Sequence, residues 1–349
     1  VKDGAPKTPF ATVPVAFRTK IHLEEDRIYD PLEKVTSELA DRFFWTGFNG
    51  SVPKLREKFL LIKLPHAVRV DRDITVRVRF QGVSYKSNAT HHAEVRINGR
   101  PVLQADWRGQ EECVVEKRIT QSRGIAEENS FVITAYDRNN TPESEMDFYL
   151  DWAEFEYWRS FDVDPGGMEF TSDVEPAVTG PVRFELKGLL SRDVEIYQVG
   201  EIGIAARIAN VRVEEDGRGF KAVMEDAVTQ PTRYYVTVKG GYRRPKEITL
   251  DKPSNLRNPA NDYDYVIISH KSFIDPIKRL AEYRESQGLK VLIVDVEDIY
   301  DEFSHGIFNP HAIRSFLKYA FFNWERPPTY VLLVGDASYD YKGAVERYY

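Results

Sequence analysis

The strongest constraint on the fold is a change of hydrophobic period that follows Asp262. Three short, continuous apolar runs come after it, at residues 265–269, 291–294 and 331–334. The stretches between these runs carry apolar side chains at helical spacing. Short buried strands that alternate with amphipathic helices are typical of a parallel sheet with right-handed crossovers. We therefore predict a βαβαβ arrangement from residue 263 onward.

Capping residues mark where the helices of this region begin and end. Asp275 and Asn309 each precede a proline, a pattern that predicts a side-chain cap followed by proline at the first helical position. Gly288 stands where the first of these helices should end, at a position that favours a left-handed backbone. The three residues together predict the boundaries of both helices.

Before Asp262 the dominant pattern is strict alternation of apolar and polar residues, which indicates antiparallel strands. Asn98-Gly99 lies between two alternating runs and predicts a tight hairpin, because both turn positions need a positive φ. Within residues 147–159 the apolar residues alternate regularly, but at Trp152-Ala153 they change from one face of the predicted strand to the other. This flip predicts either a β-bulge or burial on both faces of the strand.

The chain is expected to be multidomain, because 349 residues exceed what one ordinary core organises. Many short strands separated by turn residues predict a β-sandwich, roughly of jelly-roll type, followed by a small β domain. The proline-rich start is expected to be a largely irregular extension with one alternating run. The expected boundaries are 1–40 for this N-terminal extension, 41–160 for the sandwich, 165–245 for the small β domain, 246–262 for a linker and 263–349 for the α/β part.

Charge and composition exclude several classes of function. The net charge is -7, which argues against a nucleic-acid partner because such proteins usually carry a basic excess. No apolar stretch approaches the roughly 18 to 20 residues that span a bilayer, so no transmembrane segment is expected. The start at Val1, without Met or an apolar signal core, is typical of a processed or excised chain.

Chemistry is expected at the carboxyl ends of the parallel strands, where open sheets bind their ligands. The loops that follow the three strands carry Asp295, Asp298, Asp336 and Asp340. Their carboxylates are candidate ligands for Ca²⁺ or Mg²⁺; the alternative is a solvated acidic loop beside a structural Asp336. Neither a GxGxxG nor a GxxxxGK[ST] motif is present, so that nothing indicates a phosphate-cradling loop.

Cys113 is the single cysteine, which excludes intrachain disulfides and cysteine-rich zinc sites. A dyad of Cys113 with His305 is conceivable, but Cys113 falls in the predicted sandwich and is better interpreted as a small core residue. His91 and His92 are neighbours on a strand, point to opposite faces and therefore make a weak metal site. A loop or edge position is the expected place for this pair.

Several motifs of the chain resemble the gingipain-like cysteine peptidases, the relatives of caspases that use type IX secretion. The most specific are DYVIISH at 264–270, LAEYRESQGL at 280–289, VDVEDIYDEF at 294–303 and the runs 310–320 and 330–341. Upstream, residues 92–99, 148–152 and 256–259 resemble the β modules of the larger, sortase-like members. The resemblance extends over nearly the whole chain.

This resemblance implies the first half of a caspase-like α/β domain, with its first three strands in the order 2-1-3. In the family, the nucleophilic Cys and its His follow the strand that ends here at Gly335-Asp336, and we expect both beyond Tyr349. No catalytic residue is therefore assigned, no cofactor is required, and the chain is expected to be inactive alone. The implied partners are a protein or peptide substrate and the remainder of the peptidase domain, in cis or as a processed chain. The implied location is extracellular or at the cell surface.

Two other classes of function stay open. The chain could be a cell-surface glycan- or protein-binding β-sandwich with a non-catalytic α/β domain, in which an exposed Trp45 or Trp107 would stack on sugars. Core packing is the more ordinary role of such residues. The third class is a small-molecule enzyme of flavodoxin-like form that uses Asp336.

Overall fold

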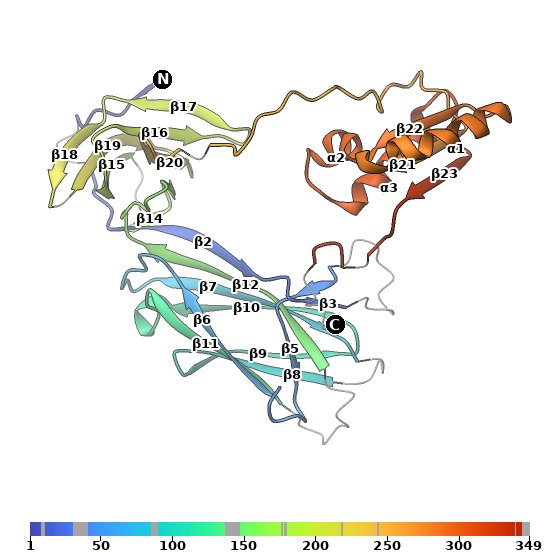
Figure 1. The fold of residues 1–349 in the computed structure, drawn as a ribbon. Helices are drawn as coiled ribbons and strands as arrows, with labels where there is room; N and C mark the ends of the chain where they lie inside the picture. The colour runs from blue at the N-terminus through green and yellow to red at the C-terminus, as the bar shows by residue number, and fades with distance from the viewer. Residues whose placement is uncertain are drawn as a thin grey trace. The chain divides into compact units, whose positions relative to one another are not determined.

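The computed structural model describes residues 1–7, 11–30, 41–84, 90–136, 147–175, 177, 180–217, 219–242, 244–338 and 340–343. It contains two compact units, which divide between Arg244 and Pro245. The first is built from strands and the second is α/β (Figure 1). Among the helices that are described, none has both the length and the apolar character that crossing a bilayer demands.

The larger part of the first unit is a β-sandwich. One sheet has the order β10-β7-β12-β2-β14 with β5 also paired to β12, and the facing sheet has the order β6-β11-β8-β9. The strands of the first sheet are β2 (Ala16–Glu24), β5 (Thr46–Asn49), β7 (Asp73–Gly82), β10 (Glu112–Thr120), β12 (Asp147–Arg159) and β14 (Val174–Glu175). Those of the second are β6 (Glu57–Lys63), β8 (Thr90–Ile97), β9 (Arg100–Arg108) and β11 (Glu128–Ala135). A separate short pair, β3 (Ile28–Tyr29) and β4 (Phe43–Phe44), comes between β2 and β5 in the sequence.

Alternation along the strands creates the core between these sheets. In β7, Val76, Val78 and Phe80 are fully buried, whereas the intervening Arg77 and Arg79 are half-buried and form ion pairs. Phe131 of β11 meets Phe155 of β12 edge to face, with ring centroids 5.8 Å apart. Contacts of this kind join the two sheets, and each fully buried large side chain contributes about 1.5–3 kcal/mol of transfer free energy.

Two local predictions in the sandwich are confirmed. Asn98 and Gly99 have φ values of 50° and 76° and connect β8 to β9 in an antiparallel hairpin. In β12 the register against β7 shifts between Leu150 and Trp152. The flip of phase in the sequence is therefore a β-bulge, and Asp151 is the extra residue.

The smaller part of the first unit has a five-stranded sheet, β1-β17-β16-β20-β13, and a three-stranded sheet, β15-β19-β18. A turn at Asp216-Gly217 joins β18 to β19. The strands are β1 (Lys2–Asp3), β13 (Met168–Thr171), β15 (Gly180–Leu189), β16 (Val194–Val199), β17 (Ile204–Ala209), β18 (Arg212–Asp216), β19 (Gly219–Val228) and β20 (Arg233–Val238).

The N-terminal segment differs from the extension expected at 1–40. β1 pairs with β17 of the small β module, and β2 pairs with β12 of the sandwich. Ala16 and Phe17, at the start of β2, are both fully buried, Ala16 in the core of the sandwich and Phe17 in that of the small module. The segment therefore links two cores, because successive side chains of a strand point to opposite faces.

The second unit contains a three-stranded parallel sheet in the order β22-β21-β23, which is the 2-1-3 order implied by the family resemblance. Its elements are β21 (Tyr265–Ser269), η3 (Lys271–Phe273), α1 (Ile274–Ser286), β22 (Val291–Asp295), α2 (Val296–Ser304), α3 (Pro310–Asn323) and β23 (Tyr330–Val334). Val266 and Ile268 pack with α2 and α3. On the other face, the Arg284 guanidinium of α1 lies 5.8 Å from the Tyr265 ring, so helices flank both faces of the sheet.

The capping predictions in this unit have different outcomes. Asn309 caps α3 as expected, its side chain accepting a hydrogen bond from the His311 N–H at 3.0 Å, and Gly288 has the predicted positive φ of 87°. Asp275 is not a cap, because α1 begins at Ile274. The helical run starts earlier, in η3, where the His270 side chain is the cap.

Part of the expected linker is anchored to the second unit. One Glu302 carboxylate oxygen accepts hydrogen bonds from the Ser254 hydroxyl at 2.5 Å and the Leu256 N–H at 2.8 Å, and the other from the Arg257 N–H at 3.0 Å. The indole N–H of Trp324 also donates to the Leu256 carbonyl at 2.8 Å. Residues from Ser254 onward therefore pack as part of the α/β unit.

The edge strand β23 exposes much of its apolar sequence. Val331 is 43% exposed and Leu333 is 59% exposed, although the run of four apolar residues predicts burial on both faces. The reason is that β23 has one neighbour, β21, among the described strands.

Candidate functional site

The candidate site is a pocket at the carboxyl ends of the parallel strands. It encloses about 310 Å³. Ser269 and His270 follow β21, Gly335 to Ser338 follow β23, and Val296 begins α2 beyond β22. The remaining wall is apolar and includes Tyr300, Phe308, Pro310, Ile313 and Tyr341. All three loops expected at this edge of the sheet thus contribute to one pocket.

His270 is the basic side chain of this pocket, and its Nδ1 atom already takes part in hydrogen bonds with Ser272. Nδ1 lies 2.8 Å from the Ser272 hydroxyl and accepts a hydrogen bond from the Ser272 N–H at 3.3 Å. Because a backbone N–H can only donate, the neutral imidazole carries its proton on Nε2. His270 therefore orients the start of η3 and is not arranged as the base of a nucleophile.

Among the described residues, the four candidate metal ligands do not form a group of three with ligand oxygens within 4.8 Å of one another. Asp295 caps α2, its side chain accepting a hydrogen bond from the Glu297 N–H at 3.2 Å. Asp298 lies in the first turn of α2; burial raises the pKa of its carboxyl, and Asp295 acts in the same direction. Asp336 is exposed at the pocket and accepts no hydrogen bond from the described residues, contrary to the expectation of a structural role, and Asp340 is half-buried.

A different acidic group satisfies metal-ligand spacing. In the part of the chain that is described, only Glu24, Asp41 and Asp151 bring carboxylate oxygens within 4.8 Å of one another as a group of three. They lie in the first unit and are far apart in sequence, so no local sequence motif predicts that they come together. The one sequence signal was the flip of phase in β12, which places Asp151 in the bulge.

Cys113 lacks the environment of a nucleophile. It lies in β10 opposite Phe80 and packs against the core of the sandwich. Burial raises the pKa of its thiol, and the carboxylates of Asp106 and Glu112 act in the same direction, so the reactive thiolate is disfavoured. His305, its conceivable partner, ends α2 in a left-handed conformation with φ of 58°.

His91 and His92 occupy a different place from the one predicted. They lie in β8, an inner strand paired with β11 and β9, and both are buried. A His91 ring nitrogen is 2.8 Å from the Gly109 carbonyl, and His92 contacts Asp106. The opposite orientation of the two rings is as expected, whereas a loop or edge position is wrong.

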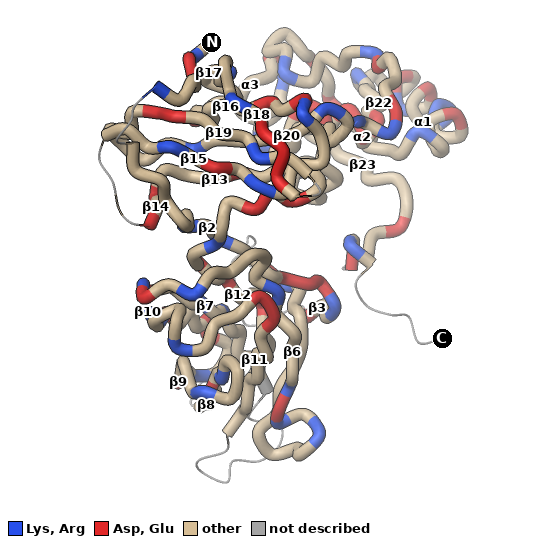
Figure 2. Tube along the Cα trace, turned by 90° about the vertical axis from the view of Figure 1, so that its left-hand side faces the viewer, with Lys and Arg blue, Asp and Glu red and all other residues tan. Residues whose placement is uncertain are grey.

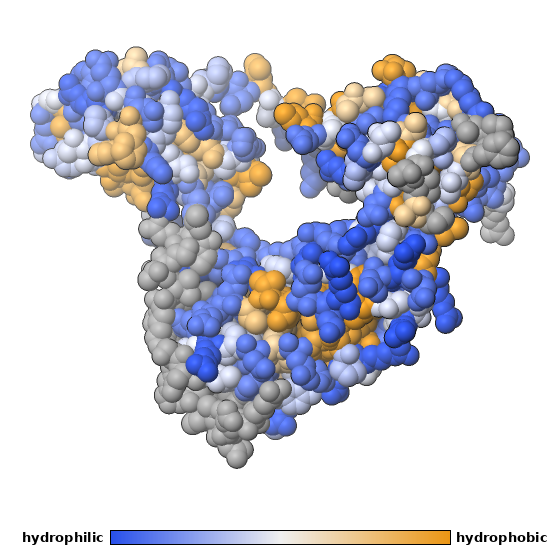
Figure 3. Space-filling model, turned by 180° about the vertical axis from the view of Figure 1, so that it is seen from behind, coloured by the Kyte–Doolittle hydropathy of each residue, from blue (hydrophilic) through white to orange (hydrophobic). Residues whose placement is uncertain are grey.

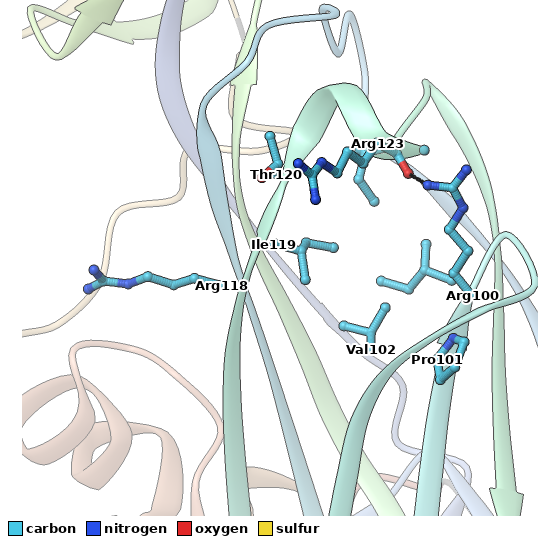
Figure 4. A pocket seen from close by; sticks show the side chains of 10 residues that line it. Arg100, Pro101, Val102, Arg118, Ile119, Thr120 and Arg123 are labelled. Carbon is cyan, nitrogen blue, oxygen red and sulfur yellow. Dashed lines mark hydrogen bonds between the residues drawn. The ribbon is translucent and has the colours of Figure 1, made fainter.

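The sandwich surface offers a second cavity of about 330 Å³ (Figure 4). Val102 and Ile119 point into it, the Arg100 guanidinium donates to the Arg123 carbonyl at its rim, and Arg118 extends away from it. Hydrophobic side chains also gather on one face of the sandwich (Figure 3). Trp45 and Trp107 take no part, because both are buried in the core.

Comparison with known families gives a match within the second unit. Residues 258–348 match Peptidase family C25, and this stretch includes all three strands of the parallel sheet. The resemblance to gingipain-like cysteine peptidases is thereby confirmed for this region. No curated protein shows a significant match to the chain.

The whole chain resembles a solved structure, that of dimeric latent PorU from Porphyromonas gingivalis. The similarity covers 99% of this chain at 16% sequence identity, with a TM-score of 0.66. It shows a shared fold. The chain spans 32% of the length of that PorU chain.

Parts of the chain also resemble sugar-binding modules. The EclA C-terminal domain, a sugar-binding protein, matches 37% of this chain and 88% of its own, at 10% identity and a TM-score of 0.25. The carbohydrate-binding module CBM36, in complex with calcium and xylotriose, matches 39% of this chain and 98% of its own, at 14% identity and a TM-score of 0.25. TM-scores this low do not support a conclusion about function.

Proposed function

We propose that the chain is the N-terminal portion of a gingipain-like cysteine endopeptidase or sortase-like transpeptidase, and that it is inactive alone. The observation that carries this proposal is the match of residues 258–348 to Peptidase family C25, on a unit whose first three strands have the order 2-1-3. In a complete enzyme of this kind, a His activates a Cys thiol and backbone N–H groups stabilise the oxyanion.

The environment of the single thiol supports the inactivity of this chain. Cys113 is held in β10 with a raised pKa, and no imidazole among the described residues is hydrogen-bonded to its thiol. We infer that the catalytic Cys and His are supplied by sequence beyond Tyr349.

The test is hydrolysis of Arg and Lys peptide esters by three proteins: chain 1–349, its Cys113→Ala variant and the longest natural polypeptide that contains the chain. We expect no hydrolysis by the first two and thiol-dependent hydrolysis by the third. Cys113-dependent hydrolysis by chain 1–349 would overturn the proposal. So would a longer polypeptide with no thiol-dependent activity towards any peptide substrate.

The edge strand β23 supports a specific partner, the remainder of the peptidase domain. Its outer N–H and C=O groups and the exposed Val331 and Leu333 offer a place for a further strand and its covering helices. We expect rapid hydrogen exchange in β23 of chain 1–349 and slow exchange when the remainder is present, in cis or as a processed chain. Strong protection of β23 in a monodisperse monomer of chain 1–349 contradicts this assignment.

The other partners and the location follow from the class of enzyme. We infer a protein or peptide substrate, no nucleic-acid partner, and an extracellular or cell-surface location reached by type IX secretion. The charge distribution supports the absence of a nucleic-acid partner, because Lys and Arg are interspersed with Asp and Glu along both β modules (Figure 2).

A second candidate function is binding of a glycan or protein by the sandwich, with a non-catalytic α/β domain. The cavity beside Arg100 and Arg123 favours it (Figure 4), because an apolar floor beneath arginine side chains suits a ligand with an anionic group. Affinity electrophoresis on a polysaccharide panel tests it. Retardation that Arg100→Ala removes would support binding, and equal mobility on every polysaccharide would count against the glycan form.

A further inference from the structure

We propose that Glu24, Asp41 and Asp151 bind a Ca²⁺ ion at the point where strand β12 exchanges one partner strand for another. One oxygen of each carboxylate lies within 4.8 Å of those of the other two. The site lies wholly in the first unit and does not depend on the peptidase assignment.

The topology of the sandwich brings the three carboxylates together. β12 pairs with β5 as far as Leu150 and with β2 from Trp152 onward, so Asp151 falls between the two ladders and inside the bulge. Glu24 ends β2 and is paired opposite Trp152. Asp41 comes two residues before β4, and the Trp45 N–H just beyond β4 donates to the Leu150 carbonyl at 2.9 Å. Three distant segments therefore each supply one carboxylate.

Asp151 gives the independent indication that a ligand is needed. Its side chain is 0% exposed. Oδ2 accepts a hydrogen bond from the Arg79 guanidinium, whereas Oδ1 is buried with no hydrogen-bond partner among the described residues. A buried carboxylate oxygen without a donor is costly, and a cation shared with Glu24 and Asp41 would satisfy it.

Glu24 and Asp41 are each oriented by a hydrogen bond to one oxygen. Glu24 Oε2 lies 2.9 Å from a His22 ring nitrogen, and Asp41 Oδ1 accepts from the Phe43 N–H at 3.0 Å. Within the described part of the chain, neither carboxylate uses its second oxygen in a hydrogen bond. Partners of this kind fix the orientation of metal-binding carboxylates, and Arg79 does the same for Asp151.

The donor set selects Ca²⁺. Oxygen ligands without nitrogen or sulfur suit a hard cation, and Ca²⁺ holds oxygens at about 2.3–2.6 Å in flexible geometry, so that one ion reaches oxygens about 5 Å apart. Asp41 and Glu24 bring two further negative charges close to the buried Asp151 carboxylate. A divalent cation would relieve this repulsion, and the exposed side of Glu24 leaves the site open to solvent.

The experiment titrates Ca²⁺ alone into chelator-treated chain 1–349 at pH 8, with calorimetry and thermal unfolding as readouts. We expect one Ca²⁺ per chain with a Kd at or below about 1 mM and a higher Tm with the ion. Glu24→Gln and Asp41→Asn should each weaken binding at least about tenfold. Asp151→Asn should abolish binding, and if that variant fails to fold, the exposed Glu24→Gln decides the outcome.

The matched control is Glu112→Gln. Glu112 is the other carboxylate partner of Arg79, at 2.7 Å, and lies outside the proposed ligand set, so this variant should bind Ca²⁺ as the parent does. The proposal is overturned if the parent chain binds no Ca²⁺ at about 10 mM, well above the range of extracellular sites. It is also overturned if Glu24→Gln and Asp41→Asn both bind like the parent, in particular if Asp298→Asn is the variant that loses the ion.

Discussion

Strand β7 of the sandwich and strand β23 of the α/β unit have apolar residues in comparable number but opposite environments. β7 lies between β10 and β12, and Val76, Val78 and Phe80 on its inner face are fully covered by the facing sheet. β23 pairs only with β21 among the described strands, and Leu333 is more than half exposed. The contrast teaches that apolar sequence predicts a strand, whereas burial depends on neighbours that the strand itself does not specify.

The largest effect is expected from Phe80→Ala in β7. The Phe80 ring stacks on Trp107 with centroids 5.3 Å apart and meets Phe148 edge to face at 5.6 Å. Its removal leaves a cavity in a core covered on all sides, and we expect a loss of about 3–5 kcal/mol in the free energy of unfolding. Urea denaturation measures it. A loss below about 1 kcal/mol would show that this core is loosely packed.

A smaller effect is expected from Glu302→Ala, which removes the polar anchor of residues 254–257. Three hydrogen bonds to its carboxylate are lost, and we expect the second unit to lose about 1–3 kcal/mol of stability. Hydrogen exchange of this unit measures the loss. Glu282→Ala, at an exposed position of α1, is the control and should leave exchange unchanged; equal effects of the two variants would contradict the anchoring role.

Leu333→Ala in β23 is the counterpart of Phe80→Ala and should cost less than about 1 kcal/mol in chain 1–349, because the side chain is 59% exposed. The same variant should cost about 2–5 kcal/mol once a further strand and helices cover β23. Denaturation with and without the remainder of the domain measures the difference. Identical costs in the two states would mean that nothing covers Leu333.

The smallest effect concerns the pH dependence of the second unit. The Lys290 N–H, followed by the Arg326 side chain, lowers the pKa of the Asp264 carboxyl. A group with a lowered pKa in the folded state stabilises the fold above its unfolded pKa of about 3.9, and this contribution is lost as the pH falls through the folded value. Acidification from about pH 6 towards pH 3 should therefore destabilise the unit.

Asp264→Asn tests that origin. The variant should be slightly less stable than the parent near pH 7, and the difference should shrink as the pH falls below the unfolded pKa of about 3.9 and through the lower folded value. Thermal unfolding across this range measures both. The effect is modest because solvent screens a group near the surface, and a constant difference at every pH would contradict the assignment to Asp264.

Local signals in the sequence predicted the local structure well. The Asn98-Gly99 turn, the Asn309 cap and the bulge in β12 each depend on residues that are neighbours in sequence. Asp275 shows the limit of this approach, because the helical run begins earlier and is capped by the His270 side chain, five residues before Asp275. Asp295 was interpreted as a metal candidate, and the structure shows that it caps α2, because α2 begins directly after β22.

Long-range pairing could not be predicted from these signals. Nothing near Lys2 indicates that it pairs with Ile208. Likewise, Glu24, Asp41 and Asp151 have no common motif, because the exchange of partner strands along β12 brings them together. The strand order 2-1-3 was available only through the family resemblance, since the spacing of three parallel strands does not fix their order.

The division of the N-terminal segment between two modules determines when its strands can pair during biosynthesis. β1 and β2 leave the ribosome well before their partners β17 and β12, which follow much later in the chain. At about 5–20 residues per second, the wait for β17 lasts on the order of ten seconds or more. Until β12 has been made, β2 is without its long partner strand, and its alternating Arg18 and Lys20 are the kind of charges that keep such a strand from joining the wrong neighbour. Two strands made early in this stretch thus reach their final places only after their late partners have been made.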